Sequence, residues 1–568
     1  MRVALSSLAS RSGGGSFIRP FIGVENVGIH VLAAGLRERG HKVELIDAVA
    51  LGLSLEEVKL RLRSFRPEFI GMSPTLSVMP ETIELAAFAK GLSPIPVVAI
   101  GGHHASLTAR AILEHEPDID VVSVGEADVT LPALTAALEE GRDLEEVAGL
   151  AFRRLGYVVA TGSAPTITCL DDLPFMSRDT LFELRARGGL VGANIQAARG
   201  CPYSCAFCST PTFVQGGPRY RRRSVESVIA EMAEVVEHHG VHLFNFTDDI
   251  FLVPNELSLQ WAREFSQGIR SRGLEVAIAV MLRAEMLREE HSDAIRELVE
   301  AGLQHVLIGI ESASARTLSF FEKGTSMSDY EQAIAFLRDQ RVFLACAFIC
   351  LEPHTRPADV IENVRFLRDV AEDPMLYHYV SQLTVFPGTP VEAKLEREGL
   401  LLDSALPYRS GRSYRFTHPV TALLAQEFSR VSSRLIAGDV QLDRVRFTLG
   451  HARAAGAIDA QVYRDRFDEL GARSRRIAGD HGAFVERCVA FAEAGQRSGL
   501  RREVEGYVRT YAEACTVALS GWDPRRLQRS PELTRPCSRE LTHRPHGEGP
   551  ARAPVYYRHA VSSIGKDS

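Results

Sequence analysis

The chain has 568 residues, of which 45% are hydrophobic and 24% charged, and its formal net charge is −7. This length predicts roughly two to four domains, and the balanced charge gives no reason to expect a nucleic-acid or membrane-surface partner. The longest apolar run, 343–351, is too short for a membrane span, and the N-terminal apolar block is too short for a signal peptide. Nine cysteines in this length do not form a disulfide framework, so we expect a cytoplasmic protein.

Residues 1–145 alternate between short apolar strands and amphipathic helices. Strands are expected at 3–5, 43–46, 69–72, 97–100 and 121–124, and helices at 27–38, 55–65, 80–90, 105–113 and 130–140. These βα units predict a doubly wound parallel sheet covered on both faces. Ligands of such sheets bind at the carboxyl ends of the strands, where small residues let a bulky ligand lie against the backbone. The sequence places there Ser73-Pro74-Thr75, Gly101-Gly102-His103-His104 and Gly125-Glu126.

Residues 146–190 are a mixed stretch that we expect to be a connector, and a second βα series fills 191–400. Its strands are expected at 191–197, 243–247, 276–280, 305–310, 343–350 and 382–386, and its helices at 225–239, 257–272, 292–301, 329–340 and 357–370. This pattern predicts a partial (β/α)6 barrel with its chemistry at the C-terminal ends of the strands. Residues 401–524 read as a helical domain, and 525–568 as a disordered tail.

Three of the cysteines, Cys201, Cys205 and Cys208, follow the first barrel strand in a C-x-x-x-C-x-x-C pattern. Three thiolates on a tight loop can bind three irons of a 4Fe-4S cluster and leave the fourth iron open to a cofactor or substrate. A tetrahedral zinc site needs a fourth ligand, and no further cysteine lies nearby. We therefore interpret these three as cluster ligands, and Cys350 as a packing residue.

With Phe207 before its last cysteine, this segment resembles the signature of the radical S-adenosylmethionine (SAM) superfamily. The resemblance implies that SAM chelates the open iron and that Phe207 lies near the adenine. Later strand ends also resemble the family's successive motifs, and they imply SAM contacts by Asp248, Arg283 and Glu311. One departure stands at the fifth strand, which reads Cys350-Leu-Glu-Pro-His354 where the family has a Gly-x-Pro-type turn.

The doubly wound segment resembles the cobalamin-binding domain of the cobalamin-dependent radical SAM branch, through the stretches 40–47, 70–73, 101–103 and 124–126. The cobalamin contacts that this implies are Ser73, Thr75, Gly101, Gly102, His103, Gly125 and Glu126. The Asp-x-His-x-x-Gly motif that supplies a lower cobalt ligand in methionine-synthase-like domains does not occur, so no protein histidine is expected below the cobalt. A degenerate relic or a flavodoxin-like spacer is the alternative interpretation. A methylthiotransferase is excluded, since the first cysteine is Cys169.

Together the resemblances imply an enzyme that uses a 4Fe-4S cluster, SAM and cobalamin. Our leading hypothesis is a C-methyltransferase of secondary metabolism, in which a 5′-deoxyadenosyl radical activates an sp3 carbon and methylcobalamin supplies the methyl group. Cobalamin-dependent oxidative cyclases or rearrangement enzymes share these motifs and stay as an alternative. A non-catalytic cobalamin/Fe-S sensor or electron carrier is a second alternative, although an open iron argues against it.

The expected partners are a small-molecule or peptide substrate and an electron donor such as flavodoxin or ferredoxin. No nucleic acid is expected to bind. The basic residues that follow the cysteines, Arg219 and 221–223, are interpreted as a solvated face.

Overall fold

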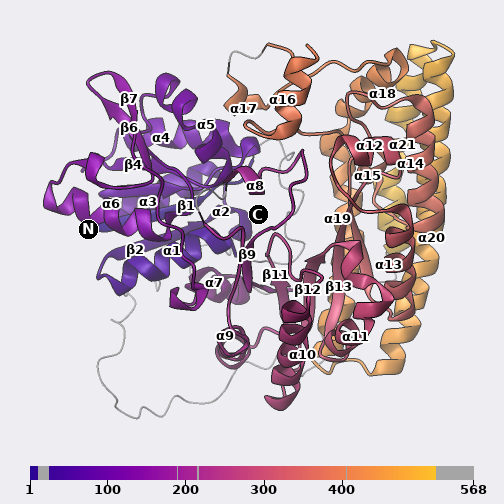
Figure 1. The fold of residues 1–568 in the computed structure, drawn as a ribbon, viewed down its shortest axis with the longest axis horizontal. Coiled ribbons are helices and arrows are strands. Elements are labelled where there is room, and N and C mark those ends of the chain that lie inside the picture. The colour runs from indigo at the N-terminus through magenta and orange to yellow at the C-terminus, as the bar shows by residue number, and fades with distance from the viewer. Residues whose placement is uncertain (11–24, 188–189, 214–216, 404–405, 520–568) are drawn as a thin grey trace, which may run out of the picture.

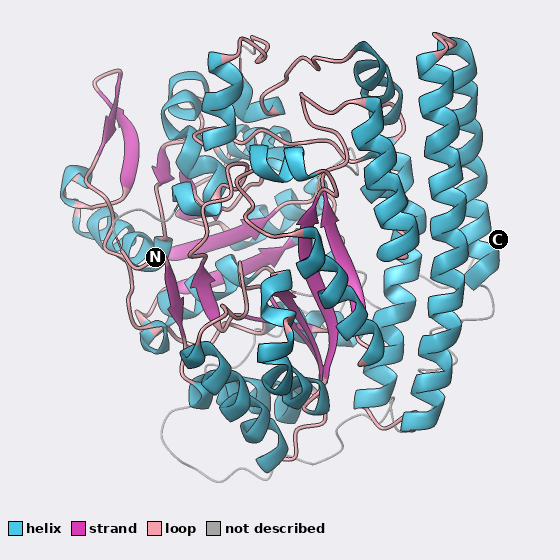
Figure 2. Ribbon diagram, turned by 45° about the vertical axis from the view of Figure 1, so that its right-hand side comes forward, coloured by secondary structure: helices cyan, strands magenta, loops and turns pink. Residues whose placement is uncertain are grey.

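A computed structural model describes residues 1–10, 25–187, 190–213, 217–403 and 406–519. Two α/β units lie side by side, and long C-terminal helices flank the second unit on the side away from the first (Figure 1). The helices cover the strands on their outer faces, as Figure 2 shows from a second direction. The expected fold class, a doubly wound sheet followed by a second parallel sheet and a helical region, is confirmed.

The N-terminal sheet has the strand order β2-β1-β3-β4-β5-β6-β7, and its first five strands are parallel. These strands are β1 (Arg2–Ser7), β2 (Lys42–Asp47), β3 (Phe69–Met72), β4 (Val97–Ile100) and β5 (Val121–Ser123). Their buried, mostly apolar side chains follow the expected pattern. The helices between them are α1 (Val27–Glu38), α2 (Ala48–Leu51), α3 (Leu55–Phe65), α4 (Met79–Ala89), α5 (His103–His115) and α6 (Ala127–Glu140).

An antiparallel hairpin extends this sheet into the stretch that the sequence indicated as a connector. Strand β6 (Leu150–Arg154) pairs with β5, and β7 (Tyr157–Ala160) pairs with β6. The connector proper therefore begins after β7 and contains α7 (Asp179–Arg187).

The second sheet has five parallel strands in the order β14-β13-β12-β11-β8. They are β8 (Ala193–Ile195), β11 (Leu243–Phe246), β12 (Ala277–Leu282), β13 (Leu303–Glu311) and β14 (Phe343–Phe348). The sixth expected strand, 382–386, adds only a single parallel bridge between Leu351 and Gln382. The helices of this unit are α8 (Thr210–Phe213), α9 (Val225–His239), α10 (Glu256–Ser271), α11 (Ser292–Glu300), α12 (Ala315–Phe320), α13 (Met327–Asp339) and α14 (Pro357–Arg365).

A small antiparallel hairpin, β9 (Ala198–Gly200) with β10 (Tyr220–Arg222), encloses the cysteine segment at the carboxyl end of β8. This hairpin is the part of the second unit that carries the ion pairs to α6 described below.

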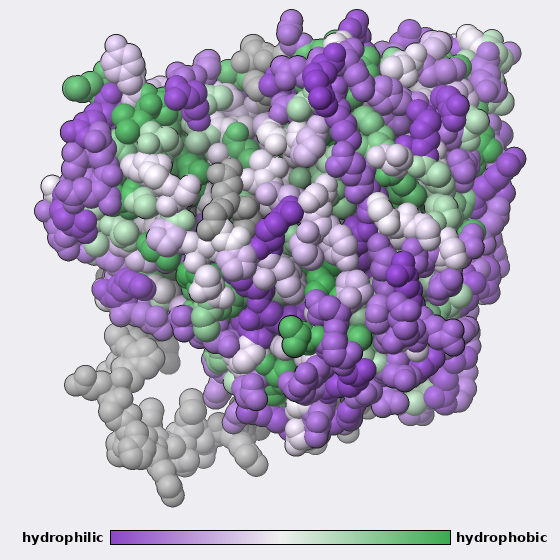
Figure 3. Space-filling model, viewed as in Figure 1, coloured by the Kyte–Doolittle hydropathy of each residue, from purple (hydrophilic) through white to green (hydrophobic). Residues whose placement is uncertain are grey.

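Helices follow the last strand. They are α15 (Leu376–Val380), α16 (Pro390–Arg397), α17 (Pro407–Ser410), α18 (Pro419–Ser429), α19 (Ser432–Ala454), α20 (Ala460–Glu493) and α21 (Arg497–Leu519). An apolar cluster that includes Leu449 and Leu470 packs the long helices against Phe343 of β14. The expected tail, 525–568, lies outside the described residues. In the described part no helix is long and apolar enough to cross a membrane, and Figure 3 shows a face dominated by hydrophilic residues.

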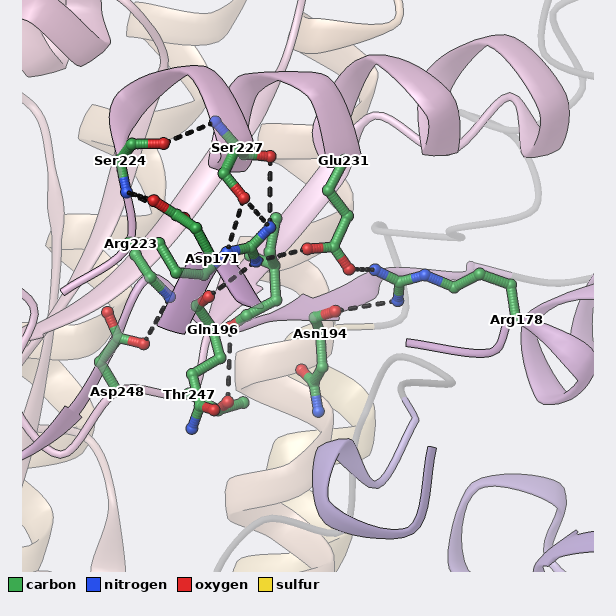
Figure 4. A network of polar contacts seen from close by, with 12 residues as sticks. Asp171, Arg178, Asn194, Gln196, Arg223, Ser224, Ser227, Glu231, Thr247 and Asp248 are labelled. Atoms are coloured by element: carbon green, nitrogen blue, oxygen red, sulfur yellow. Dashed lines mark hydrogen bonds and ion pairs between the residues drawn. The ribbon is translucent and has the colours of Figure 1, made fainter. Parts of the chain in front are cut away.

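A buried polar network ties the connector to both α/β units (Figure 4). Arg178 donates to Glu25 at 2.5 Å, to the Asn194 carbonyl at 2.9 Å and to Glu231 at 2.8 Å. Burial raises the pKa of Glu25 to about 7. On the other side of Glu231, the guanidinium of Arg223 donates to the same carboxylate at 2.5 Å.

The interpretation of the arginines after the cysteines as a solvated face is therefore wrong for Arg221, Arg222 and Arg223, whereas Arg219 is exposed. Arg221 is 4% exposed and Arg223 is engaged by Glu231. Arg222 donates to the Phe251 carbonyl at 2.5 Å and lies over the ring of Trp261. Acceptors that lie close in space hold these arginines in the interior, and two of them, Glu126 for Arg221 and the Phe251 carbonyl for Arg222, are distant in the sequence.

Candidate active site between the two sheets

A cavity of about 510 Å³ lies where the carboxyl ends of the N-terminal strands face the cysteine segment. The second unit also lines this cavity, through residues of β9, α8 and the loop after β11, among them Arg199, Phe213 and Asp249. All seven residues expected to contact cobalamin line this cavity: Ser73, Thr75, Gly101, Gly102, His103, Gly125 and Glu126. Because the carboxyl ends of the parallel strands meet at one edge of the sheet, residues up to 53 positions apart in the sequence, from Ser73 to Glu126, lie around the same cavity.

The cavity wall is shaped by close backbone approach. Gly102 has φ +89°, and a Cβ atom there would lie 2.8 Å from the Ser73 hydroxyl. Leucine side chains from β1, α1 and α6 also line the cavity. Among the described residues, the buried hydroxyl of Ser123 faces this cavity without a hydrogen-bond partner. A large ligand that is mostly apolar and carries amide groups, as cobalamin is, fits these surroundings.

Two of the expected cobalamin residues also contact the second unit. The His103 ring stacks on Phe213 with 3.8 Å between centroids. Both carboxylate oxygens of Glu126 accept hydrogen bonds from Arg221, at 2.9 and 2.5 Å. Beside this pair, Arg199 donates to Asp128 at 2.7 and 3.2 Å. The Glu126 carboxylate is therefore turned toward the β9–β10 hairpin.

The three cysteines of the candidate cluster site lie on one loop. Cys205 is buried, whereas Cys201 and Cys208 are partly exposed, and the Cys208 amide donates to the Cys205 carbonyl at 3.1 Å. Burial raises the pKa of the Cys201 thiol to about 11 and also raises the pKa of Cys208. The metal-free thiols of Cys201 and Cys208 therefore hold their protons at neutral pH, and metal binding has to displace them.

No group of three or more His, Cys, Asp or Glu side chains in the described ranges is arranged around a single metal ion. A 4Fe-4S cluster makes a different demand, because each thiolate binds its own iron. Three thiols spaced along one loop fit that donor set.

The four residues expected to contact SAM lie in different surroundings. Phe207 packs edge-on against Phe321, with ring centroids 5.1 Å apart. Asp248 is buried and accepts a hydrogen bond from the Ala197 amide at 2.9 Å, while burial raises its pKa to about 7. Its carboxyl group thus supports the backbone just before the cysteine loop. The neighbouring Asp249 accepts from the Gly200 amide at 3.1 Å and lines the cavity.

Glu311 and Arg283 take part in a buried polar cluster beneath the cysteine loop. Glu311 has φ +66° and accepts from the Lys323 ammonium at 3.1 Å. Arg283 donates to Glu285 at 2.8 Å, and its Nη1 lies 3.6 Å from the Cys205 Sγ. Sequence reasoning missed Asp249, Glu285 and Lys323 as site residues. Only Asp249 had a usable signal, as the second acid of a strand-end Asp pair.

Comparisons with known proteins agree with this architecture. The B12 binding domain family matches residues 23–135, and the Radical SAM superfamily matches residues 195–367. This order of domains defines the chain as a member of the cobalamin-dependent radical SAM enzymes. The cofactors of this class are cobalamin, SAM and a 4Fe-4S cluster.

Individual relatives differ in their named reactions. An uncharacterized methyltransferase of Pyrococcus horikoshii is 29% identical over 398 residues, which span 70% of this chain and 83% of that protein. An anaerobic magnesium-protoporphyrin IX monomethyl ester cyclase of Synechocystis is 28% identical over 65% of this chain and 73% of that protein. The structure of the cobalamin-dependent SAM radical enzyme OxsB superposes with a TM-score of 0.69 at 18% identity, over 92% of this chain and 80% of that one.

Proposed function

We propose that the chain is a C-methyltransferase that acts on an unactivated carbon. The observation that carries the proposal is a cavity bounded on one side by the glycine-rich strand ends and on the other by the cysteine-loop unit. When bound, SAM with the cluster supplies the hydrogen-abstracting radical, and cobalamin supplies the methyl group. A substrate held between them can meet both, which is the positioning that this reaction requires.

The roles of this chain's residues follow from their places. Cys201, Cys205 and Cys208 hold the cluster, and the glycines and small residues at the ends of β3, β4 and β5 hold cobalamin. Phe207 and Glu311 contact SAM, while Asp248 supports the loop backbone. We assign the cobalamin domain, with the β6–β7 hairpin that extends its sheet, to 1–160, the connector to 161–190, the barrel to 191–400 and the helical domain to 401–524. We further propose a cytoplasmic enzyme that receives electrons from a flavodoxin or ferredoxin.

A substrate-free experiment tests the methyl-transfer step. The anaerobically reconstituted holoenzyme is reduced with titanium citrate and incubated with SAM that carries a trideuterated methyl group. The bound cobalamin is then extracted, and its mass is determined by mass spectrometry. A methyltransferase has to form trideuteromethylcobalamin from SAM. Parallel assay of 5′-deoxyadenosine reports SAM cleavage, and Cys205→Ala is the control that loses it.

The cyclase relative makes the second candidate an oxidative cyclase or rearrangement enzyme. In that case 5′-deoxyadenosine forms while cobalamin acquires no deuterated methyl group, and this outcome contradicts the methyltransferase proposal. Absence of both products from a fully loaded holoenzyme contradicts the radical SAM reaction itself and favours a sensor or electron carrier.

A further inference from the structure

Arg283 is buried against the candidate cluster loop, residues 201–208, and is 7% exposed. Its Nη1 is 3.6 Å from the Sγ atom of Cys205, within hydrogen-bonding distance for sulfur. Its guanidinium also lies over the ring of Tyr203 in the same loop, 3.9 Å from the ring centroid. The cation is therefore in contact with the loop at two residues, one of them a candidate iron ligand.

The rest of the guanidinium is fixed by oxygen acceptors. Nη2 donates to the Glu285 carboxylate at 2.8 Å, to the Lys323 carbonyl at 2.6 Å and to the Thr325 hydroxyl at 2.7 Å. The Thr325 hydroxyl in turn donates to the same Glu285 oxygen at 2.7 Å. These contacts set the plane and position of the guanidinium, so Nη1 is held toward the sulfur without help from any ligand.

We propose that Arg283 is a positioning residue that donates a hydrogen bond to the Cys205 thiolate and sets the reduction potential of the cluster. The inference rests on the proposed ligation of iron by Cys205. A nearby cation and an N–H···S hydrogen bond stabilise the more negatively charged, reduced cluster and so raise its potential. Glu285 opposes this effect, because its carboxylate neutralises the same guanidinium.

This role differs from the SAM contact that the family resemblance implies for Arg283. A group that serves only to bind SAM affects the cluster when SAM is present. A donor to the thiolate affects the cluster in the absence of SAM, and that difference makes the two roles separable by measurement.

The experiment is an EPR-monitored redox titration of the reconstituted holoenzyme without SAM. For Arg283→Met we expect the ratio of reduced to oxidised cluster at a fixed potential to fall about tenfold, which is 59 mV toward the negative for a one-electron couple. Glu285→Gln should shift the potential in the opposite direction, because it leaves the cation without its counter-charge. Arg283→Lys keeps the positive charge but loses the planar guanidinium and its fixed N–H donors, so it should give a smaller shift toward negative potential.

Arg296→Met is the control, because Arg296 pairs with Asp293 at 2.8 Å on α11 and its side chain is 48% exposed. It removes the same charge without a contact to the loop, and its potential should equal that of the wild type. If Arg283→Met does not assemble a cluster, the opposite shifts of Glu285→Gln and Arg283→Lys decide the question. Equal potentials in all these variants, with only SAM affinity altered, overturn the inference. A wild-type protein with no EPR-active cluster contradicts the proposed cluster site instead.

Discussion

The pair Glu126–Arg221 allows a sharp test of how the two α/β units are held together. The perturbation is Glu126→Gln, which keeps the shape of the side chain and removes its charge. Arg221 has a side chain that is 2% exposed, and among the described residues its other acceptor is the Ile167 carbonyl at 2.7 Å. Loss of the carboxylate therefore leaves a buried guanidinium with too few acceptors for its charge.

The expected cost follows from this geometry. Breaking a buried ion pair by neutralising one partner costs about 3–5 kcal/mol, and the 15% exposure of the Glu126 side chain places the cost near the lower end. About 3 kcal/mol corresponds to roughly a 100-fold change in a local opening equilibrium. Native-state hydrogen exchange at 127–131 and 198–200 should therefore speed up by about that factor, while exchange in α20 stays unchanged.

Measurements of cobalamin binding distinguish two roles for Glu126, which are docking of the two α/β units through Arg221 and direct contact with cobalamin. If Glu126 acts through docking, Arg221→Met should weaken cobalamin binding about as much as Glu126→Gln, and the double variant should be no worse than either single one. If Glu126 binds cobalamin itself, as the family resemblance implies, Arg221→Met leaves that contact in place, so the losses caused by the two substitutions are independent and add. Additive losses in spectrophotometric titrations with hydroxocobalamin would refute the docking role.

Three further outcomes are expected. Gly102→Ala should lower the affinity for cobalamin roughly tenfold or more in the same titration, because φ +89° with ψ −179° and the 2.8 Å approach to the Ser73 hydroxyl strain any Cβ atom. Gly141→Ala, at the left-handed C-cap of α6 with no neighbouring atom within 4 Å, is the control for a methyl group added at a positive φ away from the cavity. Cys205→Ala should lose bound iron and the absorption of the cluster, whereas Cys350→Ala, buried after β14, should keep both. Burial raises the pKa of Asp248 from 3.8 to about 7, so the native state holds a proton that the unfolded state releases. Its contribution to stability is complete below 3.8 and is lost as the pH rises through 7; the thermal midpoint of the wild type should fall over this window more than that of Asp248→Asn, and equal slopes would contradict this.

Hydrophobic periodicity was enough to predict most of the elements. The expected helices 27–38, 55–65 and 225–239 coincide with α1, α3 and α9, where an Asn or Ser cap precedes an amphipathic run. The hairpin β6–β7 was missed because its pairing partner, β5, precedes it by a whole helix and its outer strand is only partly buried. The segment 382–386 was overestimated, since strand-like composition does not provide a neighbour to pair with along its length.

The site was predictable to the extent that backbone topology controls it. Strand ends meet at one edge, so Gly101-Gly102 and Gly125 reach the same cavity whatever their side-chain contacts. The partners of charged groups were not predictable in this way. Arg221 and Glu126 are 95 positions apart, and Arg283 and Cys205 are 78 apart. Such pairs depend on how the two units pack, and a basic run in one sequence looks the same whether it is solvated or buried.

The β9–β10 hairpin connects the two halves of the proposed reaction. Its residues donate to both carboxylates at the start of α6, through Arg221 to Glu126 and Arg199 to Asp128. The same β9 strand ends at Gly200, whose amide is bound by Asp249, and the next residue is Cys201. A change in how the N-terminal domain docks on the second unit therefore shifts β9, the strand that directly precedes the first cluster cysteine. Because the substrate has to meet a radical and a methyl donor in turn, a rigid connection between their two binding sites is what this reaction requires of the fold.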